Sequence, residues 1–385
     1  MIITVVCDVL GKENNGTTIA AMNLIRSLKK KGHTVKILCP DEDKKDEEGY
    51  YVVPKINLGP LNNYVAKNGV SLAKPVKSIV RSAVEGSDAV HIMIPFSLGH
   101  AAALVAKELG IPVTSGFHAQ AENFTNHIFL MNNNFANKIT YKYFYKNLYR
   151  YVDAIHYPTQ FIRDIFESVV GKTNGYVISN GVNKTFYKRE VLKPEELKNK
   201  FVILFIGRYS KEKSHKVLMK AVSLSKYKDD IQLIFAGAGP QHETLVKYAE
   251  KLGITMPIFN FYSREDLIDV INYADLYVHP AEIEIEAIAC LEAITCGLVP
   301  VIANSPRCAT KAFAMGNNNL FENKNSDDLA SKIEYWIENP KEKEKCSLEY
   351  MGYSKKFDHD YCMDKMEEMI LETIKNYKNR NEDER

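Results

Sequence analysis

One pattern repeats along most of the 385 residues: a short apolar strand, then a helix, then another strand. In the first half, Gly32 ends a helical stretch at 18–31, and Gly110 ends another at 98–109. The strands predicted there are short apolar or β-branched runs bounded by polar residues or glycine: Ile2–Cys7, Thr34–Cys39, Ala89–Ile92, Pro112–Ser115, Ala154–Tyr157 and Tyr176–Ile178. This alternation predicts a parallel sheet with helices on both faces.

A charged, proline-containing segment at 187–200 interrupts the pattern, which then starts again. The predicted strands of the second half are Phe201–Ile206, Gln232–Ala236, Ile258–Phe261, Leu276–His279 and Val299–Ala303, and its predicted helices are Ser214–Ser225, His242–Leu252, Arg264–Asn272 and Ile285–Cys296. We therefore predict an α/β chain of two Rossmann-like, doubly wound domains, 1–190 and 191–357, that face a central cleft at the carboxyl ends of their strands. Residues 358–385 are expected to form a helix that packs back on the N-terminal domain.

Composition narrows the class of protein. The seven cysteines include no Cys-x-x-Cys pair, so reduced thiols of a cytosolic protein are expected, with neither disulfides nor a metal site. The N-terminal residues read as a strand and not as a signal peptide, and no apolar run approaches the ~18 residues of a spanning helix. Residues 1–190 carry a net charge of +7 and the remainder −5. This modest basic excess suits an acidic surface or a phosphate, and it is too weak to indicate nucleic acid.

Two cations follow the first strand of the second half. Gly207 lets the backbone leave the strand, Arg208 offers a planar bidentate donor, and Lys213 stands at the start of the next helix. Together with free amides at a helix N-terminus, they predict a diphosphate site; the alternative is a loop with surface cations. Gly237, after the next strand, could give room for a nucleotide base or could serve only a tight turn.

Two acids lie in an apolar run near the end of the second half. If Glu284 and Glu292 were both helical, they would stand ~12 Å apart along the axis and near one face. A buried carboxylate needs a hydrogen-bonding partner, and a ribose diol would supply one. The alternative is a solvated helix face.

The motifs, taken in order, resemble those of the retaining GT-B glycosyltransferases, and most of all the bacterial enzymes that glucosylate diacylglycerol. The resemblance covers nearly the whole chain and rests on Asn15-Gly16, 178–186, Gly207-Arg208 with Lys213, 236–240, 274–280, the pair Glu284 and Glu292, and 297–301. The likeness to the diacylglycerol enzymes rests on 284–292 and 116–123.

The resemblance implies a role for each matching position. Arg208 and Lys213 would hold the donor diphosphate, Glu284 would bond the donor sugar, and Glu292 would bond the ribose. The Gly16 loop would approach the phosphate and the acceptor. A UDP-sugar is then the co-substrate and no metal is required, because fixed cations stabilise the leaving diphosphate.

Two positions depart from the family pattern. The family commonly has two glycines where this chain has Asn15 and Gly16, and it often has Pro-Phe-Gly where this chain has Ile285-Glu286-Ala287. The additional acid, Glu286, changes what the sugar pocket presents, so the donor sugar cannot be carried over from the family.

His118 follows a predicted strand and should therefore open onto the cleft, where the resemblance assigns it to the donor sugar; a packed or surface role is the alternative. Glu122 and Asn123 are weaker candidates for acceptor contacts. His91 and His156, inside predicted strands, are expected to be core residues.

Cations recur at every fourth residue in the first half. Lys138, Lys142, Lys146 and Arg150 would form one helical stripe beside Tyr141, Phe144, Tyr145, Leu148 and Tyr149, and Lys67, Lys74, Lys77 and Arg81 add further basic charge. Such a stripe suits an anionic membrane surface. The alternative is a domain helix with solvated lysines and inward tyrosines.

We therefore predict a retaining hexosyltransferase of the cytoplasm that works at the inner face of the plasma membrane. It would transfer glucose from UDP-glucose to a lipid such as diacylglycerol. The alternatives are a soluble polyol, polysaccharide or protein acceptor, a non-catalytic subunit that binds a sugar nucleotide, and a nucleotide-sugar epimerase on the same fold.

Overall fold

The computed structural model describes the chain except for residues 9, 11–15, 58, 60–71, 127–129 and 384–385. Asn15 and Lys67 therefore lie outside the described residues. The chain forms two compact units, Met1–Asn180 with Asp360–Arg385, and Gly181–His359. They are called here the first and the second domain.

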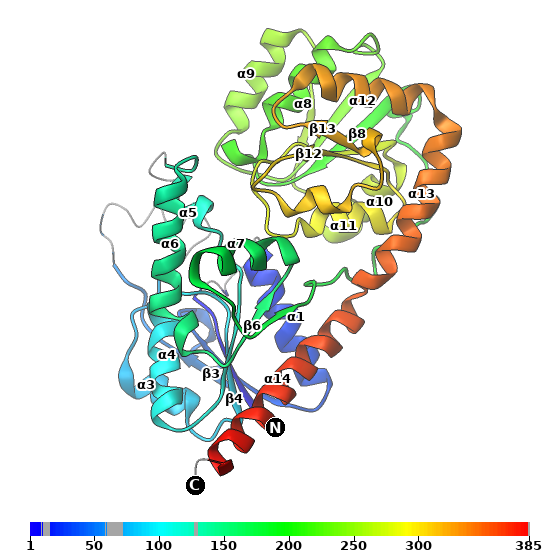
Figure 1. The fold of residues 1–385 in the computed structure, drawn as a ribbon. Helices are drawn as coiled ribbons and strands as arrows, with labels where there is room; N and C mark the ends of the chain where they lie inside the picture. The colour runs from blue at the N-terminus through cyan, green and yellow to red at the C-terminus, as the bar shows by residue number, and fades with distance from the viewer. Residues whose placement is uncertain (9, 11–15, 58, 60–71, 127–129, 384–385) are drawn as a thin grey trace. The chain divides into compact units, whose positions relative to one another are not determined.

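The first domain is built on a seven-stranded parallel sheet with the order β3-β2-β1-β4-β5-β6-β7 (Figure 1). The strands are β1 (Ile2–Val6), β2 (Thr34–Cys39), β3 (Tyr50–Val52), β4 (Ala89–Ile92), β5 (Val113–Gly116), β6 (Ala154–Tyr157) and β7 (Gly175–Val177). The central strands β1 and β4 are buried almost throughout, because helices cover both faces of a parallel sheet.

The helices of the first domain are α1 (Gly16–Lys30), α3 (Lys77–Val84), α4 (Ser97–Glu108), α5 (Ala121–Asn126), α6 (Asn134–Asn147) and α7 (Gln160–Val170), joined by the C-terminal α14 (His359–Asp383). On one face of the sheet, β1 packs against α1 and α14 through a shared apolar core. On the other face, the Thr4 hydroxyl donates to the Ala83 carbonyl of α3 at 2.8 Å.

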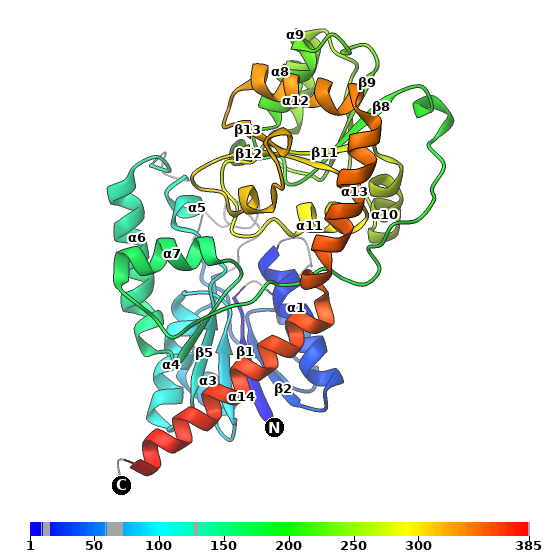
Figure 2. The same cartoon turned by 45° about the vertical axis from the view of Figure 1, so that its right-hand side comes forward.

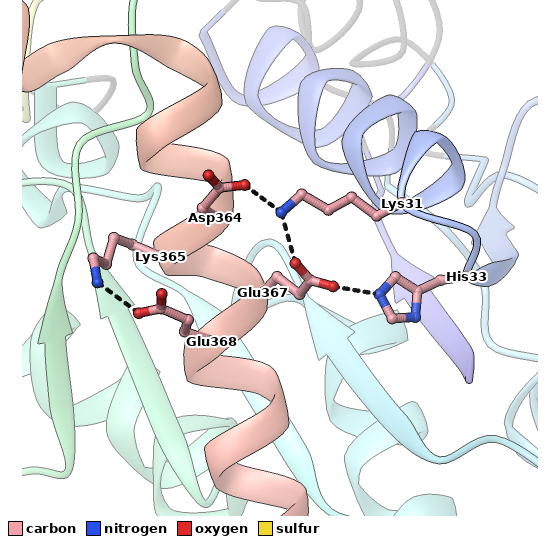
Figure 3. Close-up of polar contacts among 6 residues, drawn as sticks. All are labelled: Lys31, His33, Asp364, Lys365, Glu367 and Glu368. Carbon is pink, nitrogen blue, oxygen red and sulfur yellow. Dashed lines mark hydrogen bonds and ion pairs between the residues drawn. The ribbon is translucent and has the colours of Figure 1, made fainter.

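Helix α14 is tied to the first domain by apolar and ionic contacts. Met363, Met366 and Ile370 are buried in the core that α1 and β1 also form. Figures 1 and 2 show α14 (red) beside α1 (blue). At the end of α1, Lys31 bonds Glu367 at 2.6 Å, and Figure 3 shows Glu367 also reaching His33, at 2.7 Å.

The second domain repeats the architecture with a six-stranded parallel sheet of order β10-β9-β8-β11-β12-β13. The strands are β8 (Phe201–Ile206), β9 (Ile231–Ala236), β10 (Ile258–Asn260), β11 (Leu276–His279), β12 (Pro300–Asn304) and β13 (Leu320–Glu322). Its helices are α8 (His215–Leu224), α9 (His242–Leu252), α10 (Arg264–Tyr273), α11 (Ile288–Thr295), α12 (Ser326–Glu338) and α13 (Pro340–Ser354). In Figure 1, α8 and α12 lie on one face of this sheet, and α10 and α11 lie on the other.

The two predicted doubly wound sheets are confirmed, as is a long C-terminal helix. Two strands were not predicted: β3 and β13 have three residues each and lie at sheet edges, too short for a visible apolar run. The predicted helix at 285–296 is wrong at its start, since α11 begins at Ile288. Its N-cap, Ala287, has a φ of 63°, which interrupts the helical conformation before that point.

Glu367→Gln should destabilise the first domain by about 1 kcal/mol, because it removes the carboxylate that Lys31 and His33 share. Burial raises the pKa of Glu367, but the contacts with Lys31 and His33 lower it more, so the net pKa is lowered. A lowered folded-state pKa stabilises the fold above pH ~4.3 and loses this contribution as the pH falls further. The difference between variant and wild type, measured by urea unfolding, should therefore shrink in acid.

Glu368→Gln is the matched control, since Glu368 pairs only with Lys365 of the same helix among the ion pairs of the described chain (Figure 3). Its effect should stay within about 0.5 kcal/mol. Equal effects of the two variants would contradict a stabilising role for the α1–α14 contact.

Candidate active site

The predicted donor residues of the second domain gather where the strand order reverses. The sheet runs outward from β8 to β9 and β10 on one side, and from β11 to β12 and β13 on the other. Such a switch point leaves a crevice at the carboxyl ends of the two central strands. Gly207 follows β8 directly, and the segment 280–287 follows β11 at the same edge.

Glycines let the loops after β8 and β9 approach closely. A Cβ at Gly237 would stand 2.1 Å from the Gly207 carbonyl oxygen, and a Cβ at Gly239 would stand 2.6 Å from the Tyr209 carbonyl oxygen. Backbone at that distance cannot give way without moving the loop. Glycine at 237 therefore allows the loop that carries Gly207 and Arg208 to lie against the loop after β9.

The centre of the site is an ion pair between Lys213 and Glu284. Each of these side chains is only 18% exposed. Burial lowers the pKa of Lys213, but the attraction and hydrogen bond of Glu284, with the nearby charge of Glu212, together outweigh that effect, so the pKa is raised and the amine stays charged. Two residues 71 positions apart are thus joined by opposite charges at the switch point.

His279 lies beside this pair as a neutral imidazole. Its Nε2 atom is 3.7 Å from the Glu284 carboxylate, and its Nδ1 atom lies 3.2 Å from the Tyr277 hydroxyl. Burial, with the nearby charge of Lys213, holds the pKa of His279 well below its usual value. His279 therefore adds a polar but uncharged group next to Glu284.

Glu284 lies outside helix α11. It forms an isolated parallel bridge with Cys308, and its carbonyl accepts from the Ala309 amide at 2.9 Å. Glu284 and Glu292 therefore do not lie on one helix, and the separation expected for two helical residues does not apply to them. Glu292 alone is helical, and it faces a different environment.

Burial raises the pKa of Glu292 to about 7, and the charge of Arg264 lowers it only in part.

Glu286 is 4% exposed, so the additional acid after Glu284 lies inside the domain. Its neighbour Ile285 and Arg208 are both partly exposed.

In the first domain, His118 folds back over Gly116. A Cβ at Gly116 would stand 2.5 Å from His118 Nε2, so glycine makes room for the ring. The His118 ring meets the His156 ring edge to face, with centroids 5.6 Å apart. His156 in turn donates from Nε2 to the Ile178 carbonyl at 2.6 Å.

The histidines of this region are uncharged at neutral pH. Burial lowers the pKa of His91 to about 3 and that of His156 to about 4. Burial, with the charges that His156 and His91 would carry, holds the pKa of His118 well below its usual value. His91 and His156 are buried strand residues, as predicted.

The other predicted site residues of the first domain, Gly16, Glu122 and Asn123, lie on helices α1 and α5 and differ in exposure. Gly16 is the first residue of α1, and a Cβ there would meet nothing within 4 Å. Glu122 is buried and accepts from the Tyr141 hydroxyl at 2.8 Å, whereas Asn123 is exposed. Asp8, which the sequence did not single out, follows β1; it is 1% exposed, and burial raises its pKa to about 7.

The basic helix differs from its predicted form. Helix α6 ends at Asn147, so Arg150 belongs to the following 3-10 turn and not to the same helical stripe. Lys138, Lys142 and Lys146 are exposed on α6. The aromatic and aliphatic residues expected beside them mostly face the core, with Tyr141, Phe144, Leu148 and Tyr149 each at most 3% exposed.

A different apolar stripe is exposed on α6. Phe135, Ile139 and Tyr143 follow one another at four-residue spacing and are 74%, 51% and 58% exposed. The three lysines lie beside them. This set of six residues is called here the α6 surface.

Within the described residues, no group of three or more His, Cys, Asp or Glu side chains is placed to hold a metal ion. The described helices likewise include none with the length and apolarity to span a membrane.

Two family comparisons cover most of the chain. Residues 187–349 match "Glycosyl transferases group 1", and residues 14–186 match "Glycosyltransferase Family 4". The chain belongs to the group 1 glycosyltransferases. It is thus a retaining glycosyltransferase with the GT-B fold, as the resemblance implied.

This glycosyltransferase has relatives of different specificity. An alpha-monoglucosyldiacylglycerol synthase from Streptococcus pneumoniae is 25% identical over 75% of this chain and 68% of the relative. A GDP-mannose-dependent alpha-mannosyltransferase from Corynebacterium glutamicum is also 25% identical, over 89% of this chain and 82% of the relative. Among solved structures, Anabaena HepE in complex with UDP and glucose aligns over 97% of this chain and 100% of its own with a TM-score of 0.76 and 16% identity, which shows the fold.

Glu292→Gln should change how the stability of the glycosyltransferase depends on pH. The raised pKa means that the folded chain binds more protons than the unfolded chain between pH ~4.3 and pH ~7, so the free energy of unfolding falls as the pH rises. Glutamine cannot ionise and avoids this loss. By urea unfolding, the variant should gain about 2–3 kcal/mol on wild type between pH ~4.5 and pH ~7.5. A pH-independent difference would contradict a raised pKa of Glu292 in the folded chain.

Proposed function

We propose that the protein transfers glucose from UDP-glucose to a lipid acceptor such as diacylglycerol, in the cytoplasm, at the anionic inner face of the plasma membrane. The observation that carries the lipid acceptor is the α6 surface, where exposed apolar side chains and lysines share one helix. Exposed apolar groups beside cations suit the boundary between lipid headgroups and acyl chains. The similarity to an alpha-monoglucosyldiacylglycerol synthase supports the same acceptor.

The donor is assigned to the second domain. In this proposal Arg208 and Lys213 bind the diphosphate, Glu284 with Ile285 and Glu286 meets the sugar, and Glu292 bonds the ribose. Two features support it: the charged amine of Lys213 at the switch point, and the glycines that allow Gly207 to lie close to Gly237. Gly16 and His118 of the first domain are assigned to the donor phosphate and sugar, and Glu122 and Asn123 to the acceptor.

The proposed reaction retains the anomeric configuration. The bond between the anomeric carbon and the diphosphate oxygen breaks, and the acceptor hydroxyl forms the new bond on the same face of the sugar. The acceptor proton passes to the departing phosphate oxygen, so no protein base is needed. Lys213 and Arg208 stabilise the negative charge that develops on the diphosphate, which is the main catalytic contribution.

Transfer should be measured with radiolabelled UDP-glucose and anionic vesicles that contain diacylglycerol, a sterol, or neither. Lipid-bound glucose formed only with diacylglycerol supports the proposal. Glucosylated sterol, transfer to a soluble acceptor, or a preference for GDP-mannose would assign another specificity. Conversion of the UDP-sugar without any acceptor would indicate an epimerase.

Lys213→Ala and Glu284→Ala should each lower transfer by about a hundredfold or more, because each removes a group assigned to the reacting part of the donor. Lys216→Ala, on the exposed side of α8, is the control and should leave transfer near wild type. Full activity in Lys213→Ala would reject the assigned site.

The double variant Phe135→Ser/Ile139→Ser should bind anionic vesicles at least about tenfold more weakly in a sedimentation assay, since burial of such side chains contributes about 1.5–3 kcal/mol each. Leu192→Ser is the matched control, because Leu192 is 94% exposed and belongs to the second domain. Replacement of Lys138 and Lys142 by Gln should weaken binding mainly at low salt. Unchanged binding in all variants would exclude α6 as the membrane contact.

A further inference from the structure

Glu282 is a buried acid whose contacts surround the candidate donor site. Its side chain is 9% exposed, and its carboxylate accepts from Ser214 at 3.2 Å, Arg307 at 3.0 Å and Lys324 at 2.9 Å. The three partners come from segments before α8, after β12 and after β13. One carboxylate thus joins three loops at the carboxyl edge of the sheet.

The backbone and side chain of Glu282 hold both chain neighbours of Lys213. The Glu282 amide donates to the Glu212 carbonyl at 2.8 Å, and the Glu282 carboxylate accepts from the Ser214 hydroxyl. Lys213 stands between these two anchored residues. Its direction toward Glu284 is therefore set from Glu282.

Glu282 also fixes the segment that carries Glu284. The Ser305 hydroxyl donates to the Glu282 carbonyl at 2.7 Å, so the segment 280–284 is tied to the end of β12. Arg307, which bonds the Glu282 carboxylate, also accepts from the Glu284 amide through its carbonyl at 3.4 Å. The two members of the central ion pair are thus both positioned by one neighbour.

Residues with a strained backbone conformation lie in the segments around Glu282. Three non-glycine residues of the described chain have a positive φ: Ser214 at 53°, Ala287 at 63° and Lys324 at 66°. Two of them bond the Glu282 carboxylate directly. Left-handed conformations of such residues persist only where surrounding contacts enforce them, and they concentrate at functional sites.

We propose that Glu282 is a positioning residue for the transfer reaction: it holds Ser214, Lys324 and Arg307 so that Lys213 and Glu284 stay aligned for the donor. This inference rests on the proposed role of Lys213 and Glu284. It predicts that Glu282 acts on catalysis through Lys213 and Glu284 and does not itself touch the donor.

Glu282→Gln keeps the shape of the side chain and removes the charge that Arg307 and Lys324 share. The variant should lower kcat for transfer by about tenfold to a hundredfold, because small displacements of catalytic groups have effects of that size. The KM for UDP-glucose should change less than kcat. Glu338→Gln, which removes a surface ion pair with Lys226 of the same domain, is the matched control and should leave both constants unchanged.

A double-mutant cycle separates positioning from general destabilisation. In a Lys213→Ala background, Glu282→Gln should lower kcat by a clearly smaller factor than in the wild type, since one of the two groups that it positions is already absent. Equal fold losses in both backgrounds would overturn the proposal. A wild-type protein that transfers no sugar to any acceptor would instead refute the proposed function, so the two failures are distinguishable.

A second pair of variants tests the same point if Glu282→Gln does not fold. Ser214→Ala and Ser214→Gly both remove the hydroxyl that bonds Glu282, but glycine adopts a φ of 53° without strain. Ser214→Gly should therefore keep a kcat several-fold higher than Ser214→Ala. Equal kcat values for the two variants would show that the conformation held by Glu282 does not matter for transfer.

Discussion

The ion pair between Lys213 and Glu284 is the interaction on which the arrangement of the second domain's site depends. Its two members follow β8 and β11, strands that are neighbours only because the sheet order reverses between them. A charged amine and a carboxylate that are both largely buried stabilise a structure only if each keeps its partner. The pair therefore restrains the loops after β8 and β11 relative to each other. The Glu282 carboxylate adds a second restraint, because it accepts hydrogen bonds from Ser214 and Arg307.

The alternation of strands and helices was enough to predict both sheets, because buried parallel strands must be apolar and each crossover needs a helix. It was not enough to place Glu284. Glu282, Glu284 and Glu286 alternate with Ile283 and Ile285, a two-residue period that indicates extended backbone, whereas the longer apolar run favours a helix from Ile285 onward. The bridge from Glu284 to Cys308 and the positive φ of Ala287 arise from contacts far along the chain, which a local pattern does not contain.

Helix α6 shows a second limit of periodicity. Its sequence contains two apolar stripes, and spacing alone does not say which one meets the core. In the structure, Tyr141 packs near Phe117 and Phe166, and Phe144 packs near Phe124. Phe135, Ile139 and Tyr143 stay exposed. The buried tyrosine agrees with the alternative interpretation, a domain helix whose lysines are solvated and whose tyrosines face the core. The sequence pattern alone did not indicate that the other apolar stripe would be exposed.

Both domains hold neutral histidines near their strand ends, and the second domain adds a charged amine there. At the strand ends of the first domain, His118 and His156 are held neutral, and burial favours the protonated, uncharged form of Asp8. At the switch point of the second domain, Lys213 keeps its charge because Glu284 compensates its burial. A diphosphate leaving group needs fixed positive charge, whereas sugar and acceptor hydroxyls need only neutral hydrogen-bonding groups. The difference in protonation therefore agrees with a donor phosphate bound by the second domain and uncharged hydroxyls met by the first.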